Sequence, residues 1–294
     1  MATTTPVPLI VTDSNASLPR ELVRDLPLLT VPMEVHAGGH TYHDGVDLTP
    51  QDLYTMLRAG EFATTSPPQP KAYLAAFREA IGTEGASGPA REIVCLTPSA
   101  ELTAAHKAAI LGADAARTEG LDLDVRIIDT HTAGAAQGLV ALAAARAAAG
   151  GSKADVIEAV RRRVADVGMY GYVDSLRQLW RGGRVPRIAM WLGGMLDVKP
   201  ILSLADGKIG LVQRPRTRRR AMDQLVGLAT AHLAGARGRI AVMHADAPDR
   251  AEELAERLRA ELDPVELFVT EFTPVIGAHV GPGLVGCALH PVDD

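Results

Sequence analysis

The chain of 294 residues contains only two cysteines, Cys95 and Cys287, which lie far apart in the sequence. They form neither a Cys-x-x-Cys pair nor a dense cysteine framework. This argues against a disulfide scaffold and against a zinc site. We therefore expect no metal site and two reduced thiols, as is usual for a cytoplasmic protein.

The sequence also lacks a secretory signal and a long apolar run. Its first residues, MATTTPVPLIV, have no basic segment and too short an apolar stretch for a signal peptide. The best membrane candidate, residues 133–150, is rich in alanine but contains Gln137 and Arg146, so we expect a packed helix there. These features predict a cytoplasmic protein with no transmembrane segment.

Aromatic residues make up only 4% of the chain, and the formal net charge is −5. A negative net charge disfavours a general nucleic-acid-binding surface. The sequence contains no Gly-x-x-x-x-Gly-Lys motif and no strand followed by Gly-x-Gly-x-x-Gly, so nucleotide binding has no direct support. Hydrophobic residues reach 47%, enough for a sizeable buried core.

Positive charge is concentrated in one part of the chain. Residues 161–220 contain 12 Arg and two Lys against four Asp, a net charge of +10, so the rest of the chain carries −15. This basic segment is either a solvated face or a docking surface for an acidic partner or a phosphate.

Strand and helix patterns alternate through the first half. Short apolar runs predict strands, and capping residues such as Ser17, Thr49 and Ser99 predict helix starts. This alternation favours a mostly parallel sheet covered by helices, an N-terminal α/β/α domain over residues 1–151. The predicted strands span 8–13, 28–35, 92–97 and 123–130, and the predicted helices begin at 17, 49, 71, 99 and 133.

The second half has a different pattern, starting with a helix capped by Ser152. Asp206-Gly207 stands between two apolar runs, which is typical of a β-hairpin. We expect an α+β domain with a mixed sheet over residues 152–294, so the overall fold class is α/β with two domains. Predicted helices span 152–167, 175–180, 218–233 and 248–262, and predicted strands span 168–173, 196–204, 209–212, 239–244, 265–272 and 286–290.

Two hydroxyl clusters are candidates for an anion site. Thr65 and Ser66 precede three prolines, which prevent a helix, and Ser99 follows Pro98 at the start of a predicted helix. Hydroxyl groups and free helix amides can bind a carboxylate or a phosphate. Either cluster could equally be a simple helix cap.

Asp13 and His279 are candidates for catalysis. Asp13 ends the first predicted strand, where open α/β sheets bind ligands, but a haloacid-dehalogenase-type phosphatase would have a second aspartate at the position of Asn15. His279 lies in a glycine-rich stretch, Val275 to Gly283, that we expect to be a loop open to close approach. A lone histidine is more often structural, and no second histidine stands at metal-binding spacing.

Taken in order, eight segments of the sequence resemble the DegV family of bacterial lipid-binding proteins. The resemblance covers nearly the whole chain. Its segments are Val11-Thr-Asp-Ser, Tyr42-His-Asp-Gly-Val-Asp, Thr65-Ser66, Ile128-Asp-Thr, Arg181-Gly-Gly-Arg, Val198-Lys-Pro-Ile-Leu, Arg216-Thr and Ile276-Gly-Ala-His-Val-Gly-Pro-Gly.

The resemblance implies two domains with one long-chain fatty acid buried between them. The acid is the ligand of a non-enzymatic carrier without a cofactor, which presents it to a separate ATP-dependent fatty acid kinase for acyl-phosphate formation and phospholipid synthesis. By position in the family motifs, the headgroup residues would be Thr65, Ser66, Ser99 and His279.

Arg184 and Arg216 match basic positions of the family. We predict from the net positive charge of residues 161–220 that this segment docks the partner kinase and that both arginines belong to the docking surface. The chain departs from the family pattern after Ser99. Ala100 stands where the family motif has a serine, Ala104 where it has a glycine, and Ala105 where it has a threonine.

Two other functions remain open at this point. The chain could be a small hydrolase or phosphatase using Asp13 and His279, or a ligand sensor whose basic segment docks a regulatory partner. A carrier requires an elongated apolar cavity between the domains, and the low aromatic content fits a flexible alkyl ligand.

Overall fold

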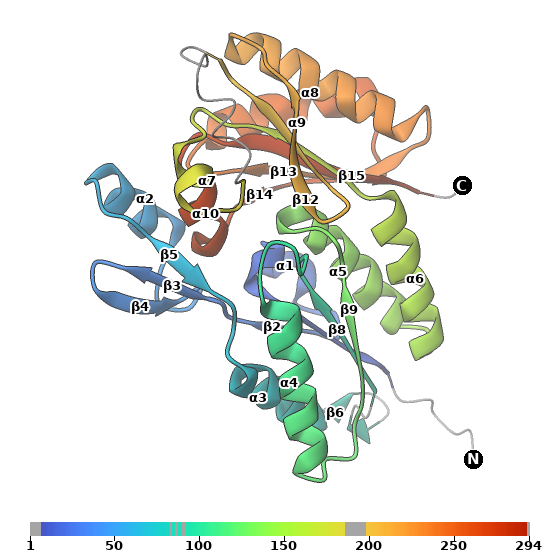
Figure 1. Ribbon diagram of the computed structural model, residues 1–294. Helices are drawn as coiled ribbons and strands as arrows, with labels where there is room; N and C mark the ends of the chain where they lie inside the picture. The colour runs from blue at the N-terminus through green and yellow to red at the C-terminus, as the bar shows by residue number, and fades with distance from the viewer. Residues whose placement is uncertain (1–6, 83, 86–87, 90–91, 186–197, 293–294) are drawn as a thin grey trace.

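The computed structural model describes residues 7–292 except for 83, 86–87, 90–91 and 186–197. Two sheets and three helical layers alternate through the molecule (Figure 1). The predicted fold class, mixed α/β with one parallel and one mixed sheet, is confirmed.

The first sheet is parallel throughout, in the order β2-β1-β8-β9. Its central strand β1 is buried along its whole length, as a strand covered on both faces requires. Helices α3 (Pro70–Gly82) and α4 (Ala105–Thr118) pack on one face. The strands are β1 (Leu9–Asp13), β2 (Leu28–Val31), β8 (Glu92–Thr97) and β9 (Asp124–Asp129).

The second sheet is mixed, in the order β12-β11-β10-β15-β13-β14, and only β13 and β14 run parallel. Asp206 and Gly207, both with positive φ, form the predicted hairpin turn. Helices α8 (Arg218–Leu233) and α9 (Pro248–Leu262) cover one face. The strands are β10 (Gly168–Tyr172), β11 (Ile201–Ala205), β12 (Lys208–Gln213), β13 (Gly238–His244), β14 (Glu266–Glu271) and β15 (Val285–Pro291).

Helix α5 (Gly134–Ala148) lies between the two sheets. Its sequence is almost entirely alanine, glycine, leucine and valine, so it can be buried all around and approach both sheets closely. A Cβ on Gly138 would lie 2.5 Å from the carbonyl oxygen of Ala16, so this contact requires glycine. Near its end, Arg146 donates two hydrogen bonds of 2.7 Å to the carboxylate of Glu266 on β14.

Helix α6 (Lys153–Asp166) begins as predicted, with a capping box between Ser152 and Asp155. It packs on α5 and contacts both β8 and β15.

A third, antiparallel sheet, β4-β3-β5, extends from the first half toward the second (Figure 1). Its strands are β3 (Glu34–Ala37), β4 (His40–His43) and β5 (Thr64–Ser66). The remaining elements are short: η1 (Ser14–Ala16), α1 (Arg20–Val23), α2 (Pro50–Arg58), β6 (Glu84–Gly85), β7 (Gly88–Pro89), α7 (Arg177–Arg181) and α10 (Pro274–Val280).

Four local predictions were wrong. The expected strand 28–35 is split at Pro32 into β2 and β3, which join different sheets. The helix expected from Ser17 begins three residues later, since Ser17 itself adopts a left-handed conformation. The helix expected from Ser99 begins at Ala105. The glycine-rich stretch around His279 is helical, because Pro274 starts and Gly281 ends a short helix there.

Candidate functional site

A cavity of about 910 Å³, counting the part open to solvent, lies between the first and second halves of the chain. Its lining is mostly apolar and includes Met33, Leu102, Met169, Leu179, Leu202, Leu204, Ile209, Met243, Phe272, Val275, Ile276, Val280 and Leu284. The polar lining residues are Asn15, Thr65, Thr103, Arg184, Ser203 and His279.

The structure brings two of the predicted headgroup residues together. Thr65 lies on β5 and His279 in the last turn of α10, and Thr65 Oγ1 is 2.7 Å from His279 Nε2. Burial, helped by the positive charge of Arg184, lowers the pKa of His279 to about 4. The imidazole is therefore neutral near pH 7.

The other ring nitrogen of His279 faces the end of α7. A Cβ on Gly182 would lie 2.6 Å from His279 Nδ1, so glycine permits this approach. Within the described part of the chain, the buried Nδ1 has no hydrogen-bond partner.

Arg184 is half-buried and lines the cavity, and its Nη1 donates to the carbonyl oxygen of Gly182 at 2.6 Å. Burial lowers the pKa of its guanidinium group. Arg184 thus places a positive charge beside His279, inside the cavity wall.

Ser66 points away from the Thr65–His279 pair. Its Oγ lies 2.8 Å from Nε2 of His36 on the neighbouring strand β3. Successive side chains of a strand point to opposite faces, so Thr65 and Ser66 do not share one face.

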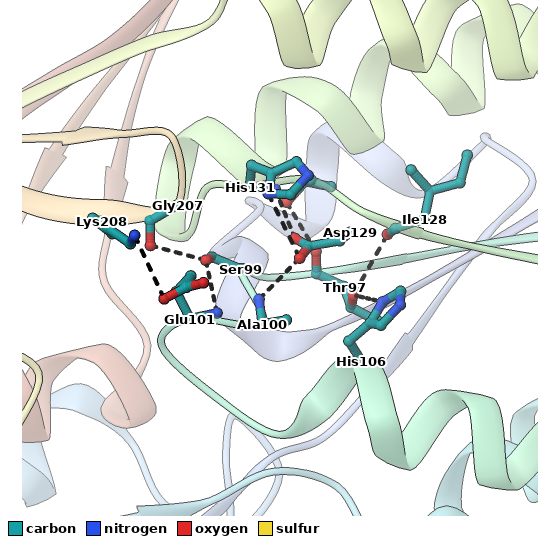
Figure 2. A network of polar contacts seen from close by, with 11 residues as sticks. Thr97, Ser99, Ala100, Glu101, His106, Ile128, Asp129, His131, Gly207 and Lys208 are labelled. Carbon is teal, nitrogen blue, oxygen red and sulfur yellow. Dashed lines mark hydrogen bonds and ion pairs between the residues drawn. The ribbon is translucent and has the colours of Figure 1, made fainter.

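Ser99 is fully buried and joins the two halves of the chain (Figure 2). Its Oγ donates to the carbonyl oxygen of Gly207 in the β11–β12 turn at 2.9 Å and accepts from the Glu101 amide at 3.2 Å. An ion pair of 3.9 Å between Lys208 and Glu101 lies alongside.

The hydroxyl residue of this loop that lines the cavity is Thr103. The sequence analysis did not select this position. Thr103 stands where the family motif has a serine. Since threonine also carries a hydroxyl group, this position could have been selected from the sequence.

Asp13 is not among the described residues that line the cavity. Its carboxylate is completely buried and accepts hydrogen bonds from the Asn15 amide, the Gln137 side chain and the Tyr73 hydroxyl. Burial raises its pKa to about 7. Asp13 is thus engaged in a closed network, and the hydrogen-bond partner of His279 is Thr65.

Asn15 is a cavity residue that sequence reasoning did not select. Its Oδ1 accepts from the amide of Gly134, the first residue of α5, at 2.9 Å, and it also lines the cavity. It fixes the start of α5 at the cavity wall.

Arg216 lies outside the cavity, exposed on the loop before α8. Further arginines are exposed beside it in the sequence: Arg214, Arg218, Arg219 and Arg220. Nearby, Asp174 forms ion pairs with Lys199, Arg218 and Arg250 at 2.9 to 3.3 Å.

Over the described ranges, no helix is long and apolar enough to cross a membrane. Nor do the described residues include a group of three or more His, Cys, Asp or Glu side chains that could hold a metal ion.

Fold and site together define a two-part α/β protein with a mostly apolar cavity between its halves and a threonine–histidine pair in the cavity wall. The family model described as "Uncharacterised protein, DegV family" matches residues 9–292. The chain belongs to the DegV family, as the sequence motifs predicted.

Relatives match over almost the whole chain. A DegV domain-containing protein of Streptomyces coelicolor is 39% identical over 279 residues, which cover 94% of this chain and 96% of the relative. A Thermus thermophilus structure, described as fatty acid binding of a DegV family protein, matches with a TM-score of 0.87 and 29% identity, covering 97% of this chain and 99% of its own. DegV of Bacillus subtilis, described as a fatty acid binding protein, has a TM-score of 0.85 and 28% identity, covering 98% and 100%.

Proposed function

We propose that this protein is a carrier that binds one long-chain fatty acid, with its acyl chain in the cavity between the two halves. The observation that carries the proposal is the mostly apolar cavity with the Thr65–His279 pair in its wall. The fatty acid binding described for the T. thermophilus and B. subtilis relatives supports it.

The acyl chain supplies most of the affinity. Each methylene buried in the cavity contributes about 0.8 kcal/mol. The polar groups then set the position of the carboxyl end.

The carboxylate would be held by Thr65, supported by His279 and Arg184. If Nε2–H of His279 donates to Thr65 Oγ1, the Thr65 hydroxyl hydrogen is free to donate to the ligand. In this tautomer Nδ1 carries a lone pair and no hydrogen. The nearby positive charge of Arg184 favours this neutral form of the ring. A neutral hydroxyl–imidazole pair binds a carboxylate with a smaller desolvation cost than a second buried charge.

The carrier would present its acid to a separate ATP-dependent kinase, which forms the acyl phosphate. The exposed arginines around Arg216 are suited to dock an acidic surface of that partner. Charges at the rim of an interface mainly accelerate encounter, so docking would depend on salt.

Organic extraction of the purified protein followed by mass spectrometry tests the proposal. A stoichiometric long-chain fatty acid, and its rebinding after delipidation, are expected. A protein that contains no acid, rebinds none and hydrolyses a phosphate ester instead would support the hydrolase hypothesis with Asp13 and His279.

A further inference from the structure

Strand β10 places a glycine in the cavity wall. Its residues alternate between two faces: Tyr170 and Tyr172 pack toward α8 and α9, whereas Met169 and Gly171 line the cavity. Strand interiors disfavour glycine, which has no side chain to pack and loses more conformational entropy on folding.

The glycine opposite, Gly286 on β15, has a clear packing role. A Cβ on Gly286 would lie 2.3 Å from the Tyr170 carbonyl oxygen and 2.6 Å from Gly171 Cα, so the strands could not keep this register. Gly286 is therefore required by the fold.

The packing around Gly171 does not require a glycine at that position. A Cβ there would meet the Val285 oxygen at 3.5 Å, and Gly286 Cα and Leu284 Cδ2 at 3.6 Å, which are ordinary van der Waals contacts. Gly171 is also not among the described glycines with positive φ. Among the described residues, neither packing nor backbone conformation explains a glycine at this position, which lines the cavity.

We infer that Gly171 is a specificity-determining residue, whose missing side chain leaves space that the acyl chain occupies. This inference rests on the proposed function. Met169, Leu202 and Leu284 line the cavity beside Gly171, so a larger side chain at 171 would take volume from an apolar part of the cavity. Long acids would lose more buried methylenes than short ones.

The experiment compares Gly171→Val with the wild type and with Gly210→Val. Gly210 lies on β12 of the same sheet and is not part of the described cavity lining. Among the described atoms, a Cβ there would meet Ser203 Oγ alone, at 3.7 Å. Delipidated proteins are titrated with straight-chain acids of increasing length, and thermal midpoints are measured in parallel.

For Gly171→Val we expect the affinity for the longest acids to fall at least tenfold relative to the shortest, while Gly210→Val keeps the wild-type profile. Each methylene displaced from the cavity forfeits about 0.8 kcal/mol, roughly fourfold in affinity. Thermal midpoints of the ligand-free variants should be similar. If Gly171→Val does not fold, Gly171→Ala should show a smaller change in the same direction.

An unchanged chain-length profile in the folded Gly171 variants would overturn the inference, as would an equal loss of affinity for all lengths. Failure of the proposed function gives a different result, because the wild type would then bind none of the acids.

Discussion

Thr65 Oγ1 and His279 Nε2 lie 2.7 Å apart although 214 positions separate the two residues in the sequence. The contact joins β5 of the small antiparallel sheet to α10, which leads into the last strand of the second sheet. It therefore joins the two halves of the chain at the cavity wall.

Loss of this pair should weaken binding of the acid but not of its ester. His279→Ala and Thr65→Val are each expected to lower the affinity for a long-chain acid by roughly ten- to a hundredfold, since a hydrogen bond to a charged group contributes roughly 1.5–3 kcal/mol. The methyl ester of the same acid should be affected much less. Ser66→Ala is the matched control, because the Ser66 hydroxyl bonds His36. An equal loss in Ser66→Ala would contradict the assignment.

Arg184→Ala should act inside the cavity. Removal of the half-buried charge is expected to raise the pKa of His279 and to weaken acid binding severalfold. The pKa can be followed by NMR of the imidazole ring. Unaltered titration of His279 together with normal acid binding would exclude this role.

Arg216→Ala should act on the partner instead. Fatty acid affinity is expected to stay at the wild-type level, while acyl-phosphate formation by the kinase slows, and more so at low salt where screening is weak. Arg117→Ala, which removes an exposed arginine from α4 in the first half, is the control. Equal rates for both variants at every salt concentration would refute docking through Arg216.

Asp13→Asn should change how stability depends on pH. Burial raises the folded-state pKa of Asp13 to about 7 from 3.8, so the folded protein keeps a proton that the unfolded chain has lost. This contribution is fully present below about pH 3.8 and is lost as pH rises through about 7, at up to roughly 1.4 kcal/mol per pKa unit.

Thermal midpoints measured between pH 5 and 8 should therefore fall less steeply for Asp13→Asn than for the wild type. Asp114→Asn removes a half-exposed carboxylate paired with Arg117 and should keep the wild-type slope. Parallel curves for wild type and Asp13→Asn would show that Asp13 does not carry the effect.

Ser99→Ala should affect stability more than binding. The variant loses the hydrogen bond to Gly207, and we expect the free energy of unfolding in urea to drop by about 1 kcal/mol. Thr103→Val, which alters a cavity residue, should instead change acid affinity. If Ser99→Ala instead lowered acid affinity without changing stability, Ser99 would be a headgroup residue.

Much of the fold could be predicted because local signals agree with the tertiary structure. The caps at Thr49 and Ser152 and the Asp206-Gly207 turn all form as predicted. The split at Pro32 was missed although the proline is itself a local signal, because proline cannot donate a ladder hydrogen bond and argues against one continuous strand.

The candidate site was harder to predict. A motif gives the order of residues but not the direction of each side chain, so Thr65 and Ser66 seemed equivalent until the strand was seen to turn them to opposite faces. The role of Ser99 likewise could not be predicted locally. Its hydroxyl donates to Gly207 in the β11–β12 turn, more than a hundred positions away in the sequence.

The position of α5 between the sheets has a consequence for folding. Ala135, Ala136 and Leu139 belong to the same core as Ala241 and Met243 of the second sheet. Beginning with the very next residue, Val140, Ala141 and Ala144 belong to the core of the first sheet. Since one helix completes both cores, neither half buries its apolar surface alone, and the two halves should unfold in a single cooperative transition.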